Sequence, residues 1–358
     1  MGSDDHDHGK ISHNYMILRP EEVSLCDLIG ILVSSDIACK AFVKIPTGKE
    51  ENIKDRGIMF MSLLGQKLLQ SFSVPISKLG SALEMWLNIL SSNGNLSLLL
   101  LHVLQDYQRK ATTQGFMFHD KISDPDTIII AFRGTETFDA DAWCTDIDLS
   151  WYEFDMGKIH GGFMKALGLV INQGWPKEYE QESKKPLAYY TLREELKKFL
   201  KQNSRTKFIL TGHSQGGALA ILFPAVLAFH EETQLLERLE GVLPHDDSTF
   251  LFKHFGTCLY YNSCYRGEIV EEEPDKNYIL QAMIPRILIS WWELLRSFMM
   301  PYMEGPDFVE TGLLKFARFV GLVFPSFASH SPQDYVNLTR LGFPDDILIQ
   351  ASRKVYGN

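Results

Sequence analysis

The stretch Lys207-Phe-Ile-Leu-Thr-Gly-His-Ser-Gln-Gly-Gly-Ala-Leu219 decides the fold of this chain. Strand-forming apolar residues run into a glycine-flanked serine, and a helical run rich in alanine and leucine follows at once. A serine on such a bend has a strained backbone, which is tolerated only if the residues two before and two after it lack a Cβ. Gly212 and Gly216 meet that requirement. The pattern therefore predicts a nucleophile elbow with Ser214 as the nucleophile.

The elbow also predicts where negative charge is stabilised. The first amides of the following helix, including that of Gln215, would face the position where a carbonyl oxygen becomes negatively charged. His213 is part of the bend and cannot turn back onto its neighbour. A glycine-rich turn without chemistry is the alternative interpretation of this motif taken alone.

The chain before the elbow predicts an α/β arrangement. We expect two strands and two helices there: the strands Gln114–Phe118 and Thr127–Phe132, and the helices Met164–Gln173 and Thr191–Gln202. Strand, helix, helix and strand in this order favour a mainly parallel central sheet with flanking helices. The run from Glu136 to Trp151, just after the second strand, is typical of a movable cover over a site, or of an ordinary surface helix.

Residues 1–110 predict a helical N-terminal region, with helices over Val23–Val33 and Ile58–Leu69. Ser81–Leu104 contains two apolar halves, and each is too short to cross a bilayer of about 30 Å. They are expected to form a hairpin that docks on the protein core or, as the alternative, associates with a lipid surface. Residues 111–358 would form the second domain.

Composition limits the possible partners. The chain has 358 residues, 45% hydrophobic and 22% charged, with a formal net charge of −10. The negative charge argues against nucleic acid and leaves apolar contact as the route to a membrane. Five cysteines without a C-x-x-C pair, and an acidic polar amino terminus, predict an intracellular protein that is not secreted. The sequence does not predict an oligomeric state.

A serine nucleophile needs a histidine base and an acid that orients it. Four histidines follow Ser214: His230, His245, His254 and His330. His330 lies in a loop after an expected helix, which suits a base, and His245 and His254 stay open as rivals. The aspartates between serine and His330 do not follow a recognisable strand: Asp246, Asp247, Asp275 and Asp307.

Four motifs in order resemble the class 3, fungal-lipase-like enzymes. They are Phe132-Arg-Gly-Thr135, Ile159-His-Gly-Gly-Phe163, Thr211-Gly-His-Ser-Gln-Gly-Gly-Ala218 and the segment from His330 to Asn337. Wider runs are similar to the plant oil-body triacylglycerol lipases: Phe138-Asp-Ala-Asp-Ala-Trp143, His254-Phe-Gly-Thr-Cys-Leu-Tyr-Tyr261 and Asp334-Tyr-Val-Asn337. The pieces cover nearly the whole chain.

The resemblance implies an α/β-hydrolase fold and hydrolysis of acylglycerol esters at a lipid droplet or membrane surface, without metal or cofactor. Ser214 matches the family nucleophile and His330 the general base. Thr135 and Gln215 match the oxyanion positions. The segment from Thr137 to about Asp148 matches the lid.

The chain also departs from the family pattern. A family block with two strands, the second ending in the catalytic aspartate, is absent near residues 241–243, so the catalytic acid is unknown and the sheet is expected to be incomplete. A second block is missing upstream of about Gln105. Losing the acid alone removes about ten-thousand-fold in turnover. We therefore expect weak esterase activity and poor folding, and two alternatives stay open: an impaired lipase-like protein that binds lipid surfaces, and a phospholipase or galactolipase.

Overall fold

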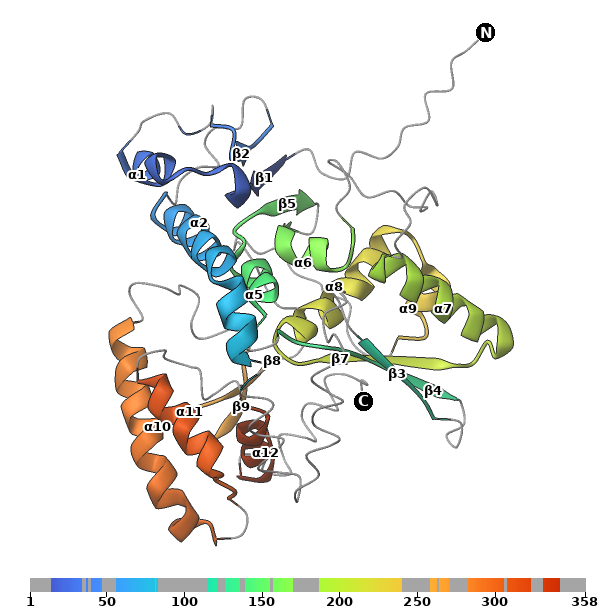
Figure 1. Ribbon diagram of the computed structural model, residues 1–358. Coiled ribbons are helices and arrows are strands. Elements are labelled where there is room, and N and C mark those ends of the chain that lie inside the picture. Colours follow the sequence, from blue (N-terminus) through green and yellow to red (C-terminus); the bar gives the residue numbers. More distant parts are fainter. Residues whose placement is uncertain are drawn as a thin grey trace. The chain divides into compact units, whose positions relative to one another are not determined.

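The computed structural model describes about three fifths of the chain in two compact units, Met1–Lys253 (unit 1) and His254–Asn358 (unit 2), shown in Figure 1. The described residues are 14–33, 37, 40–46, 56–80, 82, 115–120, 126–135, 139–154, 157–169, 187–239, 258–262, 264–270, 283–305, 308–322 and 331–341.

The central sheet of unit 1 confirms the strands that the sequence predicts. It contains β3 (Gly115–Asp120), β4 (Thr127–Phe132) and β7 (Lys207–Gly212) in the order β3-β4-β7. β3 pairs antiparallel with β4, whereas β4 and β7 are parallel. The parallel register aligns the ends of β4 and β7, with Phe132 opposite Gly212. The segments that follow these two strands therefore emerge at one edge of the sheet.

Helices α7 (Ala188–Gln202) and α8 (Gln215–Phe229) pack with this sheet. α8 is apolar on nearly every side, as expected for a helix that is buried rather than amphipathic. α8 contacts both β4 and β7. The core between these elements is fully buried and apolar, and includes Ile128, Leu196, Phe208, Phe223 and Val226.

A second, antiparallel sheet lies in the same unit, in the order β2-β1-β5-β6. Its strands are β1 (Asn14–Leu18), β2 (Val43–Lys44), β5 (Trp151–Phe154) and β6 (Gly157–His160). Three short helices lie between these strands in the chain: η1 (Pro20–Glu22), α1 (Leu25–Val33) and α5 (Ala140–Ile147). α2 (Arg56–Ser71) and α6 (Gly161–Ala166) also belong to this part, and residues 73–80, which follow α2, are helical too.

Both expected N-terminal helices are confirmed, as α1 and α2. The expectation of a wholly helical N-terminal region missed β1 and β2. β1 has no strong alternation in sequence, and it is a strand because it pairs with β5, well over a hundred residues later. The domain boundary near residue 110 stays a prediction, since residues 83–114 lie outside the described part.

The edge of β7 that does not pair with β4 forms one further backbone pairing. After α9 (Thr233–Leu236), Leu239 forms a parallel bridge with Phe208, and the Phe208 amide donates to the Arg238 carbonyl at 2.8 Å. Backbone groups of Leu210 and Gly212 face the same side, because successive residues of a strand alternate. Among the described residues, β7 pairs at this edge only through the bridge, and its other edge pairs with β4.

The described residues of unit 2 form a hairpin and three helices. The hairpin is β8 (Cys258–Tyr261) with β9 (Gly267–Val270), and the helices are α10 (Met283–Met303), α11 (Gly312–Gly321) and α12 (Pro332–Leu341). α10 and α11 pack side by side (Figure 1). A search of the described helices finds none with the length and hydrophobicity that a membrane span requires.

Candidate active site

Ser214 has the strained backbone that the sequence predicts. Its φ is 56° and its ψ is −128°, between the end of β7 and the start of α8. A residue with a side chain in this region of φ and ψ costs about 1–3 kcal/mol and persists only where the surroundings enforce it. Its side chain is exposed, so the hydroxyl is accessible from solvent.

The two elbow glycines are required by close backbone approach. A Cβ on Gly212 would collide with the backbone of Gly216, and a Cβ on Gly216 would collide with the Phe132 carbonyl. A Cβ on Gly134 would likewise collide with the His213 carbonyl and would also contact the Ser214 side chain. The elbow therefore lies directly against the end of β4, and the residue after Gly134, Thr135, lies beside it.

One amide at the start of α8 has no acceptor among the residues that the structure describes. The amide of Gly216 donates to the His213 carbonyl at 3.0 Å, and those of Gly217 and Ala218 donate to the Ser214 carbonyl at 2.9 and 3.2 Å. The Gln215 amide donates to none of the described residues. An unoccupied amide at a helix N-terminus is suited to bind a negatively charged oxygen.

The Thr135 side chain is fixed by a residue that the sequence prediction did not single out. Thr135 Oγ1 donates to Asp146 Oδ2 at 2.5 Å. Asp146 is on α5, which begins at Asp139 with a capping carboxylate and contacts α2. Four aspartates in the expected cover were the available signal, but the sequence could not say which of them contacts Thr135.

His160 of the Ile159-His-Gly-Gly-Phe163 motif caps α6. Its Nδ1 accepts from the Phe163 amide at 3.4 Å, and its ring stacks on that of Phe163 with centroids 4.3 Å apart. Burial lowers the pKa of His160 to about 4; Lys165 lowers it further and Asp148 opposes the shift. The imidazole is therefore neutral near neutral pH and stabilises the start of a helix.

The structure places only one of the histidines that follow the serine. His230 ends α8, and a 15-residue helix puts it about 22 Å from the elbow. Its Nδ1 lies 2.7 Å from the Tyr189 hydroxyl, in a buried site. His230 is thus excluded as the base for Ser214.

The remaining base and acid candidates all lie outside the described residues: His245, His254, His330, Asp246, Asp247, Asp275 and Asp307. The roles of His330 as base and of Thr135 and Gln215 at the oxyanion stay predictions. In the described part of the chain, no group of histidine, cysteine and acidic side chains is arranged to hold a metal ion.

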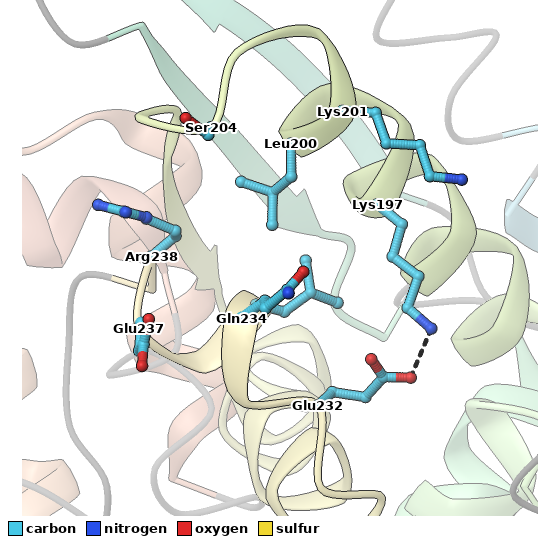
Figure 2. Close-up of a pocket in the computed structure, with 9 residues that line it drawn as sticks. Lys197, Leu200, Lys201, Ser204, Glu232, Gln234, Glu237 and Arg238 are labelled. Atoms are coloured by element: carbon cyan, nitrogen blue, oxygen red, sulfur yellow. Dashed lines mark hydrogen bonds and ion pairs between the residues drawn. The ribbon is translucent and has the colours of Figure 1, made fainter.

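A pocket of about 400 Å³ lies elsewhere in unit 1, between the last turns of α7 and α9 (Figure 2). Lys197 Nζ and Glu232 Oε1, 2.6 Å apart, form one wall, and Leu200 and Arg238 contribute to the lining. These residues precede β7 or follow α8, whereas Ser214 follows the carboxyl end of β7. The pocket is therefore separate from the elbow, because ligands of parallel sheets bind at the carboxyl ends of the strands.

Comparison with known proteins gives one family. The family described as Lipase (class 3) matches residues 129–256, which include most of β4, the elbow and α8. No solved structure is significantly similar to the chain.

Three curated relatives share the name triacylglycerol lipase OBL1. The one from Arabidopsis thaliana is 31% identical over 506 aligned residues, covering 96% of this chain and 97% of the relative. The one from Nicotiana tabacum is 36% identical over 66% of this chain, and the one from Ricinus communis 34% over 68%. This chain covers 59% and 60% of those two relatives. On these matches, and on the elbow that the structure builds from Ser214 and its glycines, the chain belongs to the class 3 lipase family.

Proposed function

We propose that this chain is a serine ester hydrolase of the triacylglycerol lipase type. The observation that carries the proposal is the exposed, strained Ser214, which lies beside the end of β4 and beside a Gln215 amide that donates to none of the described residues. A backbone strain of this kind is characteristic of functional sites. The relatives' name supports acylglycerol as the substrate class.

The chemistry is acyl transfer in two steps. Ser214 Oγ bonds to the acyl carbonyl carbon and gives its proton to a base, assigned to His330 by family resemblance. The amides of Thr135 and Gln215 stabilise the resulting oxyanion, and the protonated base gives the proton to the leaving glycerol oxygen. Water then cleaves the acyl-enzyme in the same way and releases a fatty acid. No cofactor is needed for these steps.

The Thr135–Asp146 hydrogen bond supports this assignment. A hydroxyl held by a carboxylate at 2.5 Å fixes the Thr135 side chain, and with it the residue whose amide would contact the oxyanion. Preorganised donors are effective because they do not reorganise during the reaction.

We place the reaction inside the cell, at the surface of lipid droplets. Triacylglycerols form a separate apolar phase, so a hydrolase must work where that phase meets water. The relatives' activity on triacylglycerol supports this location.

A catalytically impaired, lipid-binding relative is the second candidate. It is favoured by the edge of β7, where pairing in the described residues stops after the Phe208–Leu239 bridge. We infer that interior segments of the family are absent near residues 241–243 and upstream of Gln105. The 506 aligned positions, against 358 residues in the chain, support that inference.

The test is hydrolysis of p-nitrophenyl butyrate and of emulsified triolein by the full chain and its Ser214→Ala variant. We expect Ser214→Ala to lower the rate of both reactions by about a thousandfold or more, because it removes the nucleophile. Ser204→Ala, an exposed serine just before β7, is the matched control and should retain full activity. Equal rates for Ser214→Ala and the unmodified chain would refute the role of Ser214. A folded chain without activity on either ester would favour the impaired relative.

A further inference from the structure

The helix α10 is oriented with its polar side inward. Its described charged residues, Glu293 and Arg296, are 9% and 4% exposed, and Ser297 is fully buried. The side chains that face solvent are large and apolar or aromatic: Trp291, Trp292, Leu295, Phe298, Tyr302 and Met303. A surface helix of a water-soluble protein has the opposite arrangement, with apolar residues toward the core.

The inward polar side is accounted for by a buried ionic network. The Arg318 guanidinium of α11 is fully buried and lies 2.7 Å from Asp334 and 2.9 Å from Glu310, with Glu293 of α10 at 3.6 Å. The Tyr265 hydroxyl donates to Asp334 at 2.6 Å. One guanidinium thus pairs with three carboxylates inside unit 2, and the contact with Glu293 holds the polar side of α10 inward.

Helix α11 shows the same inversion. Arg318 is buried, whereas Phe316 and Phe319 are 64% and 63% exposed. The Lys315 ammonium lies 5.1 Å from the Phe298 ring centroid, so α10 and α11 contribute to one continuous surface. We call the exposed apolar side chains of α10 and α11 the outer face of unit 2.

The composition of the outer face indicates what covers it. Continuous exposed apolar surface marks an interaction site, because it is unfavourable in water. From Leu288 to Met303, no charged side chain of α10 faces outward, since Glu293 and Arg296 both face inward. Tryptophan and tyrosine prefer the boundary between lipid and water. At a net charge of −10, attraction to lipid must come from apolar contact of this kind.

We propose that the outer face of unit 2 binds the chain to a phospholipid-coated triacylglycerol droplet, with α10 lying in the plane of the surface. An in-plane position agrees with the absence of a membrane span among the described helices. The proposal deepens the proposed function by assigning its lipid-binding surface. It rests on that function for the choice of droplet, whereas the binding itself does not require Ser214.

The test is flotation of the full chain with triolein droplets coated with phosphatidylcholine. The variant Trp291→Gln/Trp292→Gln/Phe298→Gln should bind at least about tenfold more weakly, because three apolar anchors are lost. The matched control is Phe116→Gln/Phe118→Gln on β3 of unit 1, which changes two aromatic residues that are 62% and 60% exposed. It should change binding by less than about twofold if the effect belongs to α10.

A second measurement does not depend on folding of the triple variant. In Trp291→Phe/Trp292→Phe the face stays apolar, so the protein should still float. Brominated phosphatidylcholine should quench the tryptophan emission of the unmodified chain, and this quenching should fall by more than about half in the variant if these indoles lie in the lipid.

Several outcomes would overturn the proposal. One is flotation of the triple variant equal to that of the unmodified chain, and another is equal loss in the β3 control. A third is an unmodified chain that stays in solution as a dimer, since a second copy would then cover the face. Ser214→Ala should float normally, so loss of esterase activity with retained flotation would count against the proposed function alone.

Discussion

Unit 1 and unit 2 bury opposite kinds of side chain. The core of unit 1 between the central sheet and α7 and α8 is apolar, with Leu196, Phe208 and Phe223 fully buried. The interior of unit 2 holds Arg318 with Asp334 and Glu310 beside the buried rings of Tyr265 and Phe308, while large aromatic residues of α10 and α11 face outward. Apolar burial drives folding in water, whereas a buried ion pair contributes little net stability but is costly to break.

The comparison teaches how each unit depends on its surroundings. Unit 1 has the interior of an ordinary water-soluble domain. The buried charges of unit 2 determine how its helices pack. Much of its apolar surface stays exposed and can contact a lipid phase. We expect unit 1 to be stable without lipid, and unit 2 to become more stable when its outer face is covered.

Breaking the ionic interior should have the largest effect. Arg318→Met removes the cation that pairs with three acidic side chains, and we expect it to destabilise unit 2 by about 3–5 kcal/mol. Urea unfolding followed by tryptophan fluorescence measures the loss. Lys315→Met, one turn earlier on α11 and partly exposed, should change stability by less than about 1 kcal/mol. Similar small effects for both variants would show that the buried charges are not what holds unit 2 together.

A cavity in the apolar core of unit 1 should lower stability somewhat less than the loss of Arg318 does in unit 2. Leu196→Ala removes a fully buried side chain of α7, and such changes cost about 2–4 kcal/mol. Leu68→Ala on α2, where the side chain is 49% exposed, serves as the control and should cost under about 1 kcal/mol. Calorimetry of both variants measures the two losses of stability. A loss in Leu68→Ala as large as that in Leu196→Ala would contradict the view that apolar burial stabilises unit 1.

Unit 1 contains one buried group that should make it sensitive to acid. His160 has a folded pKa of about 4 against 6.5 when unfolded, so the unfolded chain binds more protons between these values. Its contribution is complete above pH 6.5 and is lost as the pH falls toward 4, by up to about 3 kcal/mol. Urea midpoints at several pH values measure this slope. His160→Asn keeps a capping side chain, and an unchanged slope in this variant would assign the acid sensitivity to other groups.

Removing a helix cap should have the smallest effect on stability, and the effect should be similar in the two units. Asp139 accepts from two amides at the start of α5, and Thr311 accepts from the Leu314 amide at the start of α11. Replacing either by alanine should cost about 1 kcal/mol. Thr191→Ala, at an exposed position inside α7, should change stability by less than about half a kcal/mol. Denaturant midpoints of the variants measure these losses of stability. A much larger loss in one unit would show that its capping residue also makes tertiary contacts that stabilise the unit.

Local patterns predicted the elbow well because its requirements are local. β7, the strained Ser214 and α8 follow from consecutive residues, and the structure has all three. β1 was missed because a short strand is specified by its distant partner β5. The Thr135–Asp146 contact depends on how α5 packs, which no spacing in the sequence encodes.

The inverted helices of unit 2 were beyond sequence reasoning for a related reason. The sequence of α10 contains both charged and large apolar residues, but it does not tell which side of the helix packs inward. That choice is made by Arg318 and Asp334, which belong to other helices. The catalytic acid stays unknown, since none of its candidates lies in the described residues.

The bridge between Phe208 and Leu239 has a consequence for chain length. Residues added directly after Leu239 would follow a residue that already forms a parallel bridge with β7, so they could extend the sheet at that edge without disturbing Ser214. Homologous chains of different length can therefore share one elbow and vary beyond it. This position is a natural insertion point, where growth of the sheet and preservation of the nucleophile are compatible.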